Sequence, residues 1–174
     1  GLTLDERLPL LGFVGRLVDQ KGIDLILAQM PQLLSTPCQL VILGSGFPHY
    51  EAALTEIANT HPGRVSVTIG YNESFAHRIE ASSDIFLMPS IFEPCGLNQI
   101  YSLRYGTVPL VRLTGGLKDT VTDLAEAQPT GIGFVEPRVE DLLLALQRAL
   151  TLYQDAALYK AVQQRGMQLR FGWA

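Results

Sequence analysis

The sequence predicts an α/β fold in which a doubly wound parallel sheet carries helices on both faces. The chain has 174 residues, which is enough for one domain with a full hydrophobic core and too few for two substantial ones. Apolar residues make up 47% and charged residues 17%, a composition that excludes intrinsic disorder, collagen-like repeats and coiled coils. Apolar runs of strand length alternate with segments of helical periodicity, which is the pattern of a Rossmann-like domain.

Short runs rich in Val, Ile, Leu and Phe predict buried parallel strands, and several of them end at Gly or Pro. The predicted strands lie at residues 10–15, 39–44, 65–70, 84–88, 108–112 and 131–135.

Helices are predicted between these strands and after the last one. In the first helix, Ile23, Ile26, Leu27, Met30 and Leu34 recur at steps of three and four residues, which places them on one face. The predicted helices span residues 22–34, 50–59, 74–82, 97–105, 117–127 and 139–153, and a last one runs from residue 155 to the end. Residues 1–174 are therefore expected to form one domain.

The charge and the cysteines exclude several classes of function. Thirteen basic and seventeen acidic residues give a net charge of -4, so nucleic acid and membrane surfaces are not predicted partners. Cys38 and Cys95 lie far apart without a CxxC or His-rich tract, which predicts neither a disulfide framework nor a metal site. Cys95 has no neighbouring base, so a nucleophilic thiol is not predicted either. The absence of a disulfide framework makes a reducing cytoplasm the expected compartment. No apolar run reaches the about 20 residues that span a bilayer, and no signal-peptide pattern opens the chain.

Ligands of an open parallel sheet bind at the carboxyl ends of the strands, where loops lead into helix N-termini. The loop after the first strand begins at Gly15 and carries Arg16 and Lys21, five residues apart around a turn. These two cations can converge on one diphosphate, Arg16 through its fork and Lys21 as a point charge. An ordinary solvated loop is the alternative interpretation.

The next two loops offer weaker signals. Gly44-Ser45-Gly46 lacks two β-carbons, which allows close approach of either a ligand or a neighbouring strand. The third glycine of the dinucleotide fingerprint is missing, so NAD is disfavoured. Tyr71 follows the third strand and either stacks on a base or packs against the protein.

The loop after the fourth strand carries the densest signal. Glu93 comes just before a predicted helix N-terminus, where Gly96 permits close backbone approach. Glu93 either complements the helix dipole or faces a polar ligand beside a phosphate. After the fifth strand, Thr114, Gly115 and Gly116 open another helix and predict a second nest of N–H donors.

The end of the chain carries large apolar side chains, including Phe171 and Trp173. Trp173 either folds back on this domain or belongs to a contact with a domain outside this chain. The second interpretation makes the final helix truncated near residue 174.

Several segments together resemble one known family. They are GRLVDQKGIDLI, LGSG, GYNESFAHRI and SSDIFLMPSIFEPCGLNQIYSLRYGTVPLVRLTGGLKDTV. FEPCGLNQ followed in order by RYGT and TGGL is the most specific combination. The chain resembles, over nearly its whole length, the C-terminal, nucleotide-sugar-binding domain of bacterial glycogen synthases and plant starch synthases.

The resemblance implies one half of a two-domain GT-B glycosyltransferase that retains the anomeric configuration. The expected reaction transfers glucose from ADP-glucose to the non-reducing end of an α-1,4-glucan, and it needs no metal or other cofactor. Binding of the glucan acceptor falls to the N-terminal domain of that family, which has no counterpart in this sequence. The family also implies a bacterial cytoplasm, or a plastid for a plant source.

The resemblance also implies roles for individual residues. Arg16 and Lys21 match the positions that neutralise the departing diphosphate, Tyr71 matches the base-stacking aromatic, and Glu93 matches the acidic residue that faces the glucosyl unit. Fixed cations and oriented N–H groups stabilise a leaving group most strongly as its charge develops. The remaining candidate nucleotide-sugar-binding residues are Gly15, Gly44, Ser45, Gly46, Cys95, Gly96, Leu97, Asn98, Thr114, Gly115 and Gly116.

One departure separates this sequence from many retaining relatives. Those relatives carry a second Glu eight residues after the first, and this sequence has Tyr101 at that position. The glycogen and starch synthase branch of the family also lacks the second Glu. Tyr101 thus argues against a mechanism with two carboxylates. Two alternatives remain open, a module that binds a nucleotide sugar or glucan without transferase activity and the donor domain of a related retaining glycosyltransferase.

Overall fold

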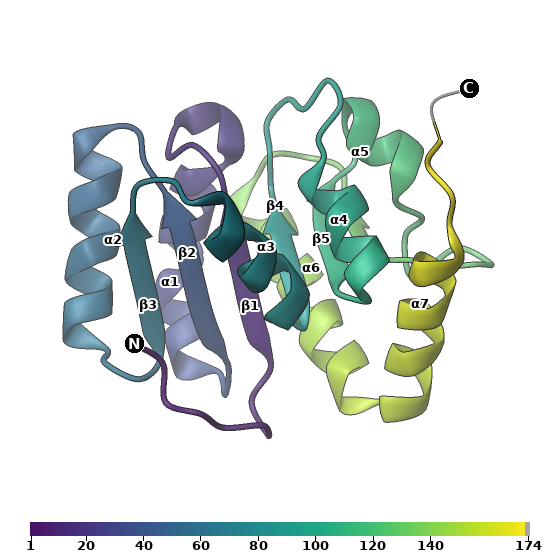
Figure 1. Ribbon diagram of the computed structural model, residues 1–174, viewed down its shortest axis with the longest axis horizontal. Coiled ribbons are helices and arrows are strands. Elements are labelled where there is room, and N and C mark those ends of the chain that lie inside the picture. Colours follow the sequence, from purple (N-terminus) through teal and green to yellow (C-terminus); the bar gives the residue numbers. More distant parts are fainter. Residues whose placement is uncertain (173–174) are drawn as a thin grey trace.

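The computed structural model describes residues 1–172 and forms one parallel sheet between two layers of helices (Figure 1). The strand order in the six-stranded sheet is β3-β2-β1-β4-β5-β6. All neighbouring strands pair in parallel. The chain winds outward from β1 in one direction and from β4 in the other, which is the doubly wound arrangement. The predicted fold class is confirmed.

The strands lie where the apolar runs predict them, with differences of at most one residue at each end. Their bounds are β1 Leu10–Val14, β2 Gln39–Gly44, β3 Val65–Ile69, β4 Ile85–Met88, β5 Val108–Arg112 and β6 Ile132–Phe134. β1, β2 and β4 are buried along almost their whole length, as expected for strands covered on both faces.

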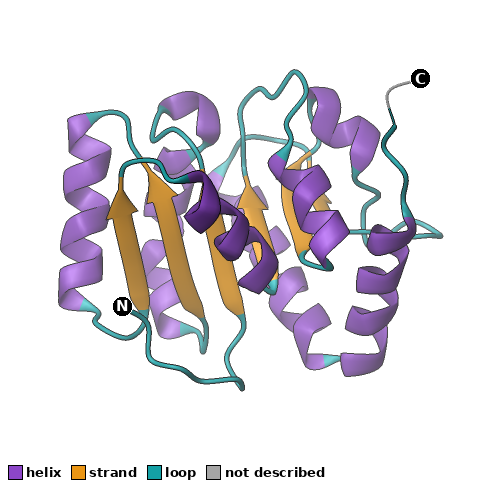
Figure 2. Ribbon diagram, in the orientation of Figure 1, coloured by secondary structure: helices purple, strands orange, loops and turns teal. Residues whose placement is uncertain are grey.

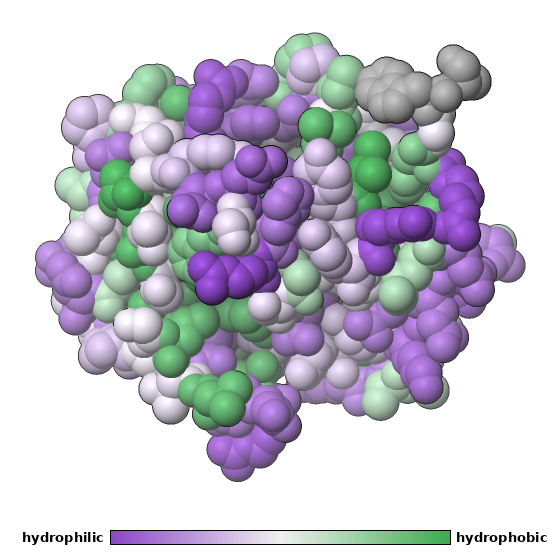
Figure 3. All heavy atoms as spheres, in the orientation of Figure 1, coloured by the Kyte–Doolittle hydropathy of each residue, from purple (hydrophilic) through white to green (hydrophobic). Residues whose placement is uncertain are grey.

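The helices cover the two faces of this sheet. Their bounds are α1 Ile23–Ser35, α2 Pro48–Thr60, α3 Glu73–Ser82, α4 Asn98–Tyr105, α5 Gly115–Thr120, α6 Val139–Gln154 and α7 Ala156–Gln168. In Figure 1, α3 and α4 lie in front of the sheet, whereas α1 and α6 lie behind it. The front face is mostly polar over α3 and α7, as Figure 3 shows.

The prediction of a helix over residues 117–127 is wrong in its length, because α5 ends at Thr120. The Thr122 carbonyl accepts N–H groups from Thr130 at 3.0 Å and from Gly131 at 3.1 Å. The Asp123 carboxylate accepts the N–H of Gly133 at 2.7 Å. These contacts tie the segment after α5 to the strand β6, so its backbone cannot continue as a helix.

The prediction that the last helix runs to the end of the chain is also wrong. α7 stops at Gln168, and Leu169 follows it in an extended conformation. Phe171 is exposed. Trp173, for which two interpretations were given, lies outside the described residues.

The core has two parts, one on each face of the sheet. Leu11 and Phe13 of β1 belong to the larger part, which they form with α1, α2 and α6. Val14 at the end of the same strand belongs to the smaller part, with α3 and α5. Successive side chains of a strand point to opposite faces, so β1, β2, β4 and β5 contribute to both parts.

All strands point the same way, so their carboxyl ends form one edge of the sheet, at the arrowheads in Figure 2. The loops at residues 15–22, 45–47, 70–72, 89–97 and 113–114 gather there. Every candidate site residue from the sequence therefore lies along this carboxyl edge or at the helix N-termini next to it.

Candidate active site

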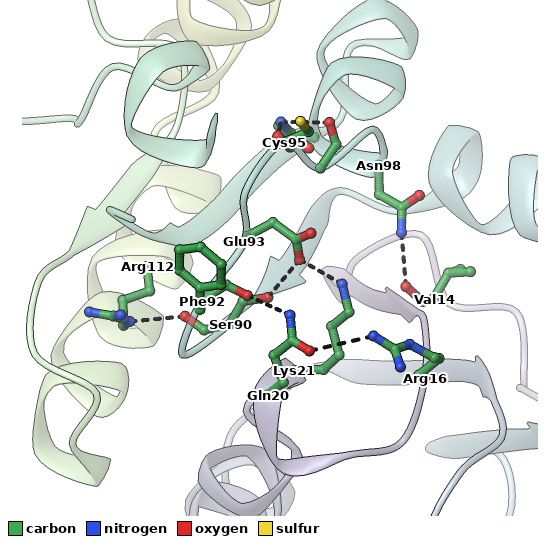
Figure 4. Close-up of polar contacts among 12 residues, drawn as sticks. Val14, Arg16, Gln20, Lys21, Ser90, Phe92, Glu93, Cys95, Asn98 and Arg112 are labelled. Carbon is green, nitrogen blue, oxygen red and sulfur yellow. Dashed lines mark hydrogen bonds and ion pairs between the residues drawn. The ribbon is translucent and has the colours of Figure 1, made fainter. Parts of the chain in front are cut away.

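An ion pair joins the two loops at the centre of the carboxyl edge (Figure 4). Lys21 Nζ lies 2.6 Å from Glu93 Oε2, and the Ser90 hydroxyl donates to the same oxygen at 3.2 Å. Glu93 is only 7% exposed, so its carboxylate is largely shielded from water. Lys21 follows β1 and Glu93 follows β4, the two neighbouring strands where the strand order reverses. This switch point is where doubly wound sheets bind ligands.

The loop that carries Lys21 is held on both of its sides. A short 3-10 turn at Asp19–Lys21 presents the lysine. The Tyr50 hydroxyl donates to the Asp19 carboxylate from α2, and this hydrogen bond, together with burial, raises the pKa of Tyr50 to about 12. On the other side, Gln20 Nε2 donates to the Phe92 carbonyl at 3.0 Å.

Arg16 lies at the start of the same loop and is exposed. Its guanidinium donates to the Gln20 side-chain oxygen at 3.4 Å, a long and weak contact. Because Gln20 also contacts the loop of Glu93, Arg16 and Lys21 lie on the same side of the loop junction (Figure 4). That the two cations converge on one diphosphate stays a prediction.

Arg112 is a residue of the site that the sequence reasoning missed. It lies at the end of β5 and donates to three carbonyls, those of Ser90 at 2.9 Å, Ile91, and Val135 at 2.7 Å. It therefore fixes the backbone just before Glu93. The sequence signal for Arg112 was a cation at the carboxyl end of an otherwise buried strand.

The glycines of the site bring backbones together. A β-carbon on Gly44 would lie 2.0 Å from the Gly15 carbonyl oxygen, and one on Gly46 would lie 2.2 Å from that of Leu17. Of the two interpretations of Gly44-Ser45-Gly46, close approach of a neighbouring segment is therefore confirmed. Ser45 itself is exposed at the edge.

The expectation of a nest of N–H donors at Thr114, Gly115 and Gly116 is wrong for Thr114, whose N–H donates to the Arg112 carbonyl at 2.9 Å, and for Gly116. Its N–H donates to the Glu93 carbonyl at 3.0 Å and to the Pro94 carbonyl at 3.2 Å. A β-carbon on Gly115 would lie 2.1 Å from the Glu93 carbonyl oxygen, so these glycines serve to seat the carboxylate loop on α5.

The start of α4 provides the free donors of the site. Across residues 1–172, the N–H groups of Cys95, Gly96 and Leu97 have no hydrogen-bond acceptor. Gly96 adopts a left-handed conformation with φ 67°, which allows the sharp turn into the helix. The side chain of Asn98 binds within the protein, because its Nδ2 donates to the Val14 carbonyl at 2.9 Å.

Tyr71 lies at the end of β3 and is 76% exposed. The interpretation that it packs against the protein is wrong, since most of its ring faces solvent. Asn72 beside it caps α3 by accepting the N–H of Phe75 at 2.8 Å. Tyr71 thus offers an exposed aromatic ring next to a capped helix start.

Other titratable groups stand apart from this cluster. His77 Nδ1 lies 2.9 Å from Glu80 Oε2 on α3, and burial raises the pKa of Glu80. The residues described by the structure contain no group of three or more His, Cys, Asp or Glu side chains placed to hold a metal ion. Among them, too, no helix is both long and apolar enough to cross a membrane.

The chain belongs to the family of glycosyl transferases group 1, whose family model matches residues 2–166. It is 59% identical over 177 residues to a glycogen synthase of Cellvibrio japonicus, a match that covers 99% of this chain and 37% of the relative. A glycogen synthase of Halorhodospira halophila is 55% identical over 95% of this chain and 35% of its own.

A solved structure supports the same resemblance. The catalytic domain of starch synthase IV from Arabidopsis thaliana, bound to ADP and acarbose, superposes with a TM-score of 0.92 at 36% identity. The match covers 99% of this chain and 37% of that one. The resemblance to bacterial glycogen synthases and plant starch synthases is confirmed, and this chain spans a little over a third of the length of these relatives.

Proposed function

We propose that this chain binds ADP-glucose as the donor domain of a retaining glucosyltransferase that extends α-1,4-glucan chains. The observation that carries the proposal is the ion pair of Lys21 and Glu93, 2.6 Å apart between the ends of β1 and β4. The relatives named glycogen synthase and the starch synthase bound to ADP and acarbose support this choice of donor and acceptor.

Lys21 and Arg16 bind the diphosphate in this proposal. When the bond from the glucose C1 to the phosphate oxygen breaks, its electron pair stays on the diphosphate. Two cations at the leaving group stabilise this charge as it develops. The ammonium of Lys21 has three protons, so it can keep Glu93 as one partner while it donates to a phosphate. The cations supply the positive charge, and we propose that no metal or other cofactor takes part.

Glu93 faces the glucosyl unit, and the N–H groups at the start of α4 bind the sugar and the phosphates. Cys95, Gly96 and Leu97 offer these donors at the positive end of a helix dipole. Tyr101, exposed on α4, occupies the place where a second carboxylate would be needed for a glycosidase-like mechanism.

The base of the nucleotide stacks on Tyr71 in this proposal, because that ring is open to solvent beside the loop of Gly44, Ser45 and Gly46. Stacking tolerates different bases, so the preference for ADP-glucose over UDP-glucose rests on the named relatives. The glucan acceptor is bound by a part of the full-length protein outside this chain. We place the reaction in the bacterial cytoplasm, as its bacterial relatives suggest.

Calorimetric titration of the 174-residue chain with adenosine, ADP, ADP-glucose and UDP-glucose tests the proposal. We expect ADP and ADP-glucose to bind, and Lys21→Ala or Arg16→Ala to weaken ADP about 10- to 100-fold while leaving adenosine unchanged, because only charge-assisted phosphate contacts are lost. Lys160→Ala, which removes an exposed cation on α7, is the matched control and should change neither ligand. Equal losses for adenosine and ADP would overturn the assignment of the two cations.

A transfer assay on glycogen with the full-length protein tests the role of Glu93. Glu93→Gln should retain ADP affinity and lose most glucosyl transfer, with chelators leaving the activity of the unaltered protein unchanged. Unaltered turnover would remove Glu93 from the reaction.

A further inference from the structure

Gln99 is fully buried near the start of α4, and its side chain reaches back into the loop before the helix. Its Nε2 donates to the carbonyl oxygens of Cys95 at 3.0 Å and Gly96 at 3.2 Å, and lies 3.2 Å from the Thr120 hydroxyl. The two carbonyls determine the orientation of the amide, because an oxygen in that place would face them without a proton between. Gln99 thus holds two consecutive carbonyls of the loop that follows Glu93.

These two contacts also determine where the next N–H groups point. A trans peptide is planar, and its C=O and N–H point in opposite directions. The Cys95 carbonyl turned toward Gln99 therefore directs the Gly96 N–H away from it. The Gly96 carbonyl does the same for the Leu97 N–H. No residue of the described part of the chain accepts either N–H.

We propose that Gln99 is a positioning residue of the donor site, and that it keeps the Gly96 and Leu97 N–H groups directed toward the bound nucleotide sugar. The inference rests on the proposed function, since it assigns the support of the same site. Without the buried amide, the peptides on either side of Gly96 can rotate, because the left-handed glycine opposes rotation least of all residues. An N–H group that already points toward the ligand stabilises negative charge without a rearrangement of the backbone.

The amide of Gln99 is also linked to the neighbouring loop. The Thr120 hydroxyl donates to the Gly116 carbonyl at 2.6 Å while it lies beside Gln99 Nε2. Gly116 in turn donates its N–H to the Glu93 carbonyl. Gln99 is therefore held from α5 as well as from its own helix, which restricts the movement of its amide.

Gln29 provides a matched control within the same chain. It is also buried, its Nε2 donates to a single backbone carbonyl, that of Val139 at 2.5 Å, and its Oε1 has no partner, as is true of Gln99. It lies on α1, and its contact is to the start of α6. Both Gln29→Met and Gln99→Met remove a buried side-chain amide. Only the amide of Gln99 contacts the loop of the proposed site.

Calorimetry on the 174-residue chain with adenosine and ADP-glucose tests the inference. We expect Gln99→Met to weaken ADP-glucose about tenfold or more and adenosine little, because the sugar and phosphate contacts depend on the directed N–H groups. Thr120→Val should weaken ADP-glucose less, and Gln29→Met should change neither ligand. In ¹H-¹⁵N spectra, ADP-glucose should shift the Gly96 and Leu97 amide signals of the unaltered chain and not those of Gln99→Met.

A loss for Gln99→Met that is equal for adenosine and ADP-glucose, or a loss of equal size for Gln29→Met, would overturn the inference and leave the proposed function standing. Failure of the unaltered chain to bind ADP-glucose would overturn the proposed function and this inference together. If Gln99→Met does not fold, Thr120→Val and the amide signals of the unaltered chain decide: unshifted Gly96 and Leu97 signals on binding would contradict the inference.

Discussion

The two edges of the sheet differ in what their polar groups leave available for a ligand. At the amino edge, where the strands begin, Arg64 donates to four backbone carbonyls of residues 33, 34, 36 and 38 around the end of α1. Gln39 Nε2 donates to the carbonyls of Thr3 and Gly63, and Asp84 accepts the Leu10 N–H at 2.7 Å. At the carboxyl edge, the contacts of Lys21 are with another side chain, and N–H groups at the start of α4 have no acceptor within residues 1–172.

This difference distinguishes polar groups that stabilise the fold from polar groups that can bind a ligand. A side chain whose hydrogen-bonding capacity is used by the backbone stabilises the fold and has nothing left for a ligand. Groups that remain unsatisfied or paired only with each other can exchange partners when a ligand arrives. At the carboxyl edge, the N–H groups at the start of α4 are such spare donors.

The comparison is tested most strongly at Gly22, where two loops of the carboxyl edge meet backbone to backbone. Gly22 has φ 73°, and a β-carbon there would lie 2.1 Å from the Pro89 carbonyl oxygen. Gly22→Ala should lower the free energy of unfolding by about 2–5 kcal/mol, since it adds left-handed strain to a backbone collision. Denaturant titration measures it.

Gly70→Ala is the control for this collision. Gly70 also has positive φ, at 131°, but has nothing within 4 Å of the β-carbon position. It should cost about 1–2 kcal/mol, from conformation alone. Equal costs at the two positions would show that the loops of the carboxyl edge are not packed backbone to backbone.

The sequence predicted the strands and most helices because buried strands and amphipathic helices leave direct periodic patterns. It also placed Arg16, Lys21, Tyr71 and Glu93 on one edge, since parallel strands bring their carboxyl ends together. It could not predict that Gly116 donates to the Glu93 carbonyl, because this contact joins loops that follow different strands.

A second test removes the largest polar network of the amino edge. Arg64→Met keeps an apolar stem and deletes the guanidinium, which leaves the carbonyls around the end of α1 without a charged donor. The free energy of unfolding should fall by about 2 kcal/mol, while calorimetry should find ADP affinity unchanged. A parallel loss of ADP affinity would mean that the two edges are not independent.

The smallest effect concerns pH. Burial raises the pKa of Asp84 above its ordinary value of 3.8, so the folded chain holds this proton more tightly than the unfolded chain. Stability is therefore lost as pH rises from the ordinary value through the raised one. Asp84→Asn keeps an acceptor for the Leu10 N–H and removes this loss, so its advantage over the unaltered chain should grow through that window and then level off.

Unfolding free energies measured at several pH values give this comparison directly. A difference between Asp84→Asn and the unaltered chain that is the same at every pH would contradict the raised pKa.

The end of α5 and the contacts of Arg112 were not predictable from the sequence. Residues 121–127 have no strong helix breaker, and α5 stops because Thr122 and Asp123 form hydrogen bonds with Thr130, Gly131 and Gly133. The only local signal for Arg112 is a cation at the end of a buried strand, and its contacts with the loops become visible only once β4, β5 and β6 lie side by side. Tertiary hydrogen bonds decided both cases.

The contact of Gly115 and Gly116 with the loop of Glu93 has a consequence for the rate of ligand binding. Backbones seated on each other at this distance move together, so a shift of the carboxylate loop carries α5 with it. The adjustment to an arriving diphosphate then falls to Lys21, whose ammonium keeps Glu93 as one partner and still has protons to donate to a phosphate. Association should be limited by diffusion and charge attraction, and not by a slow rearrangement of the loops.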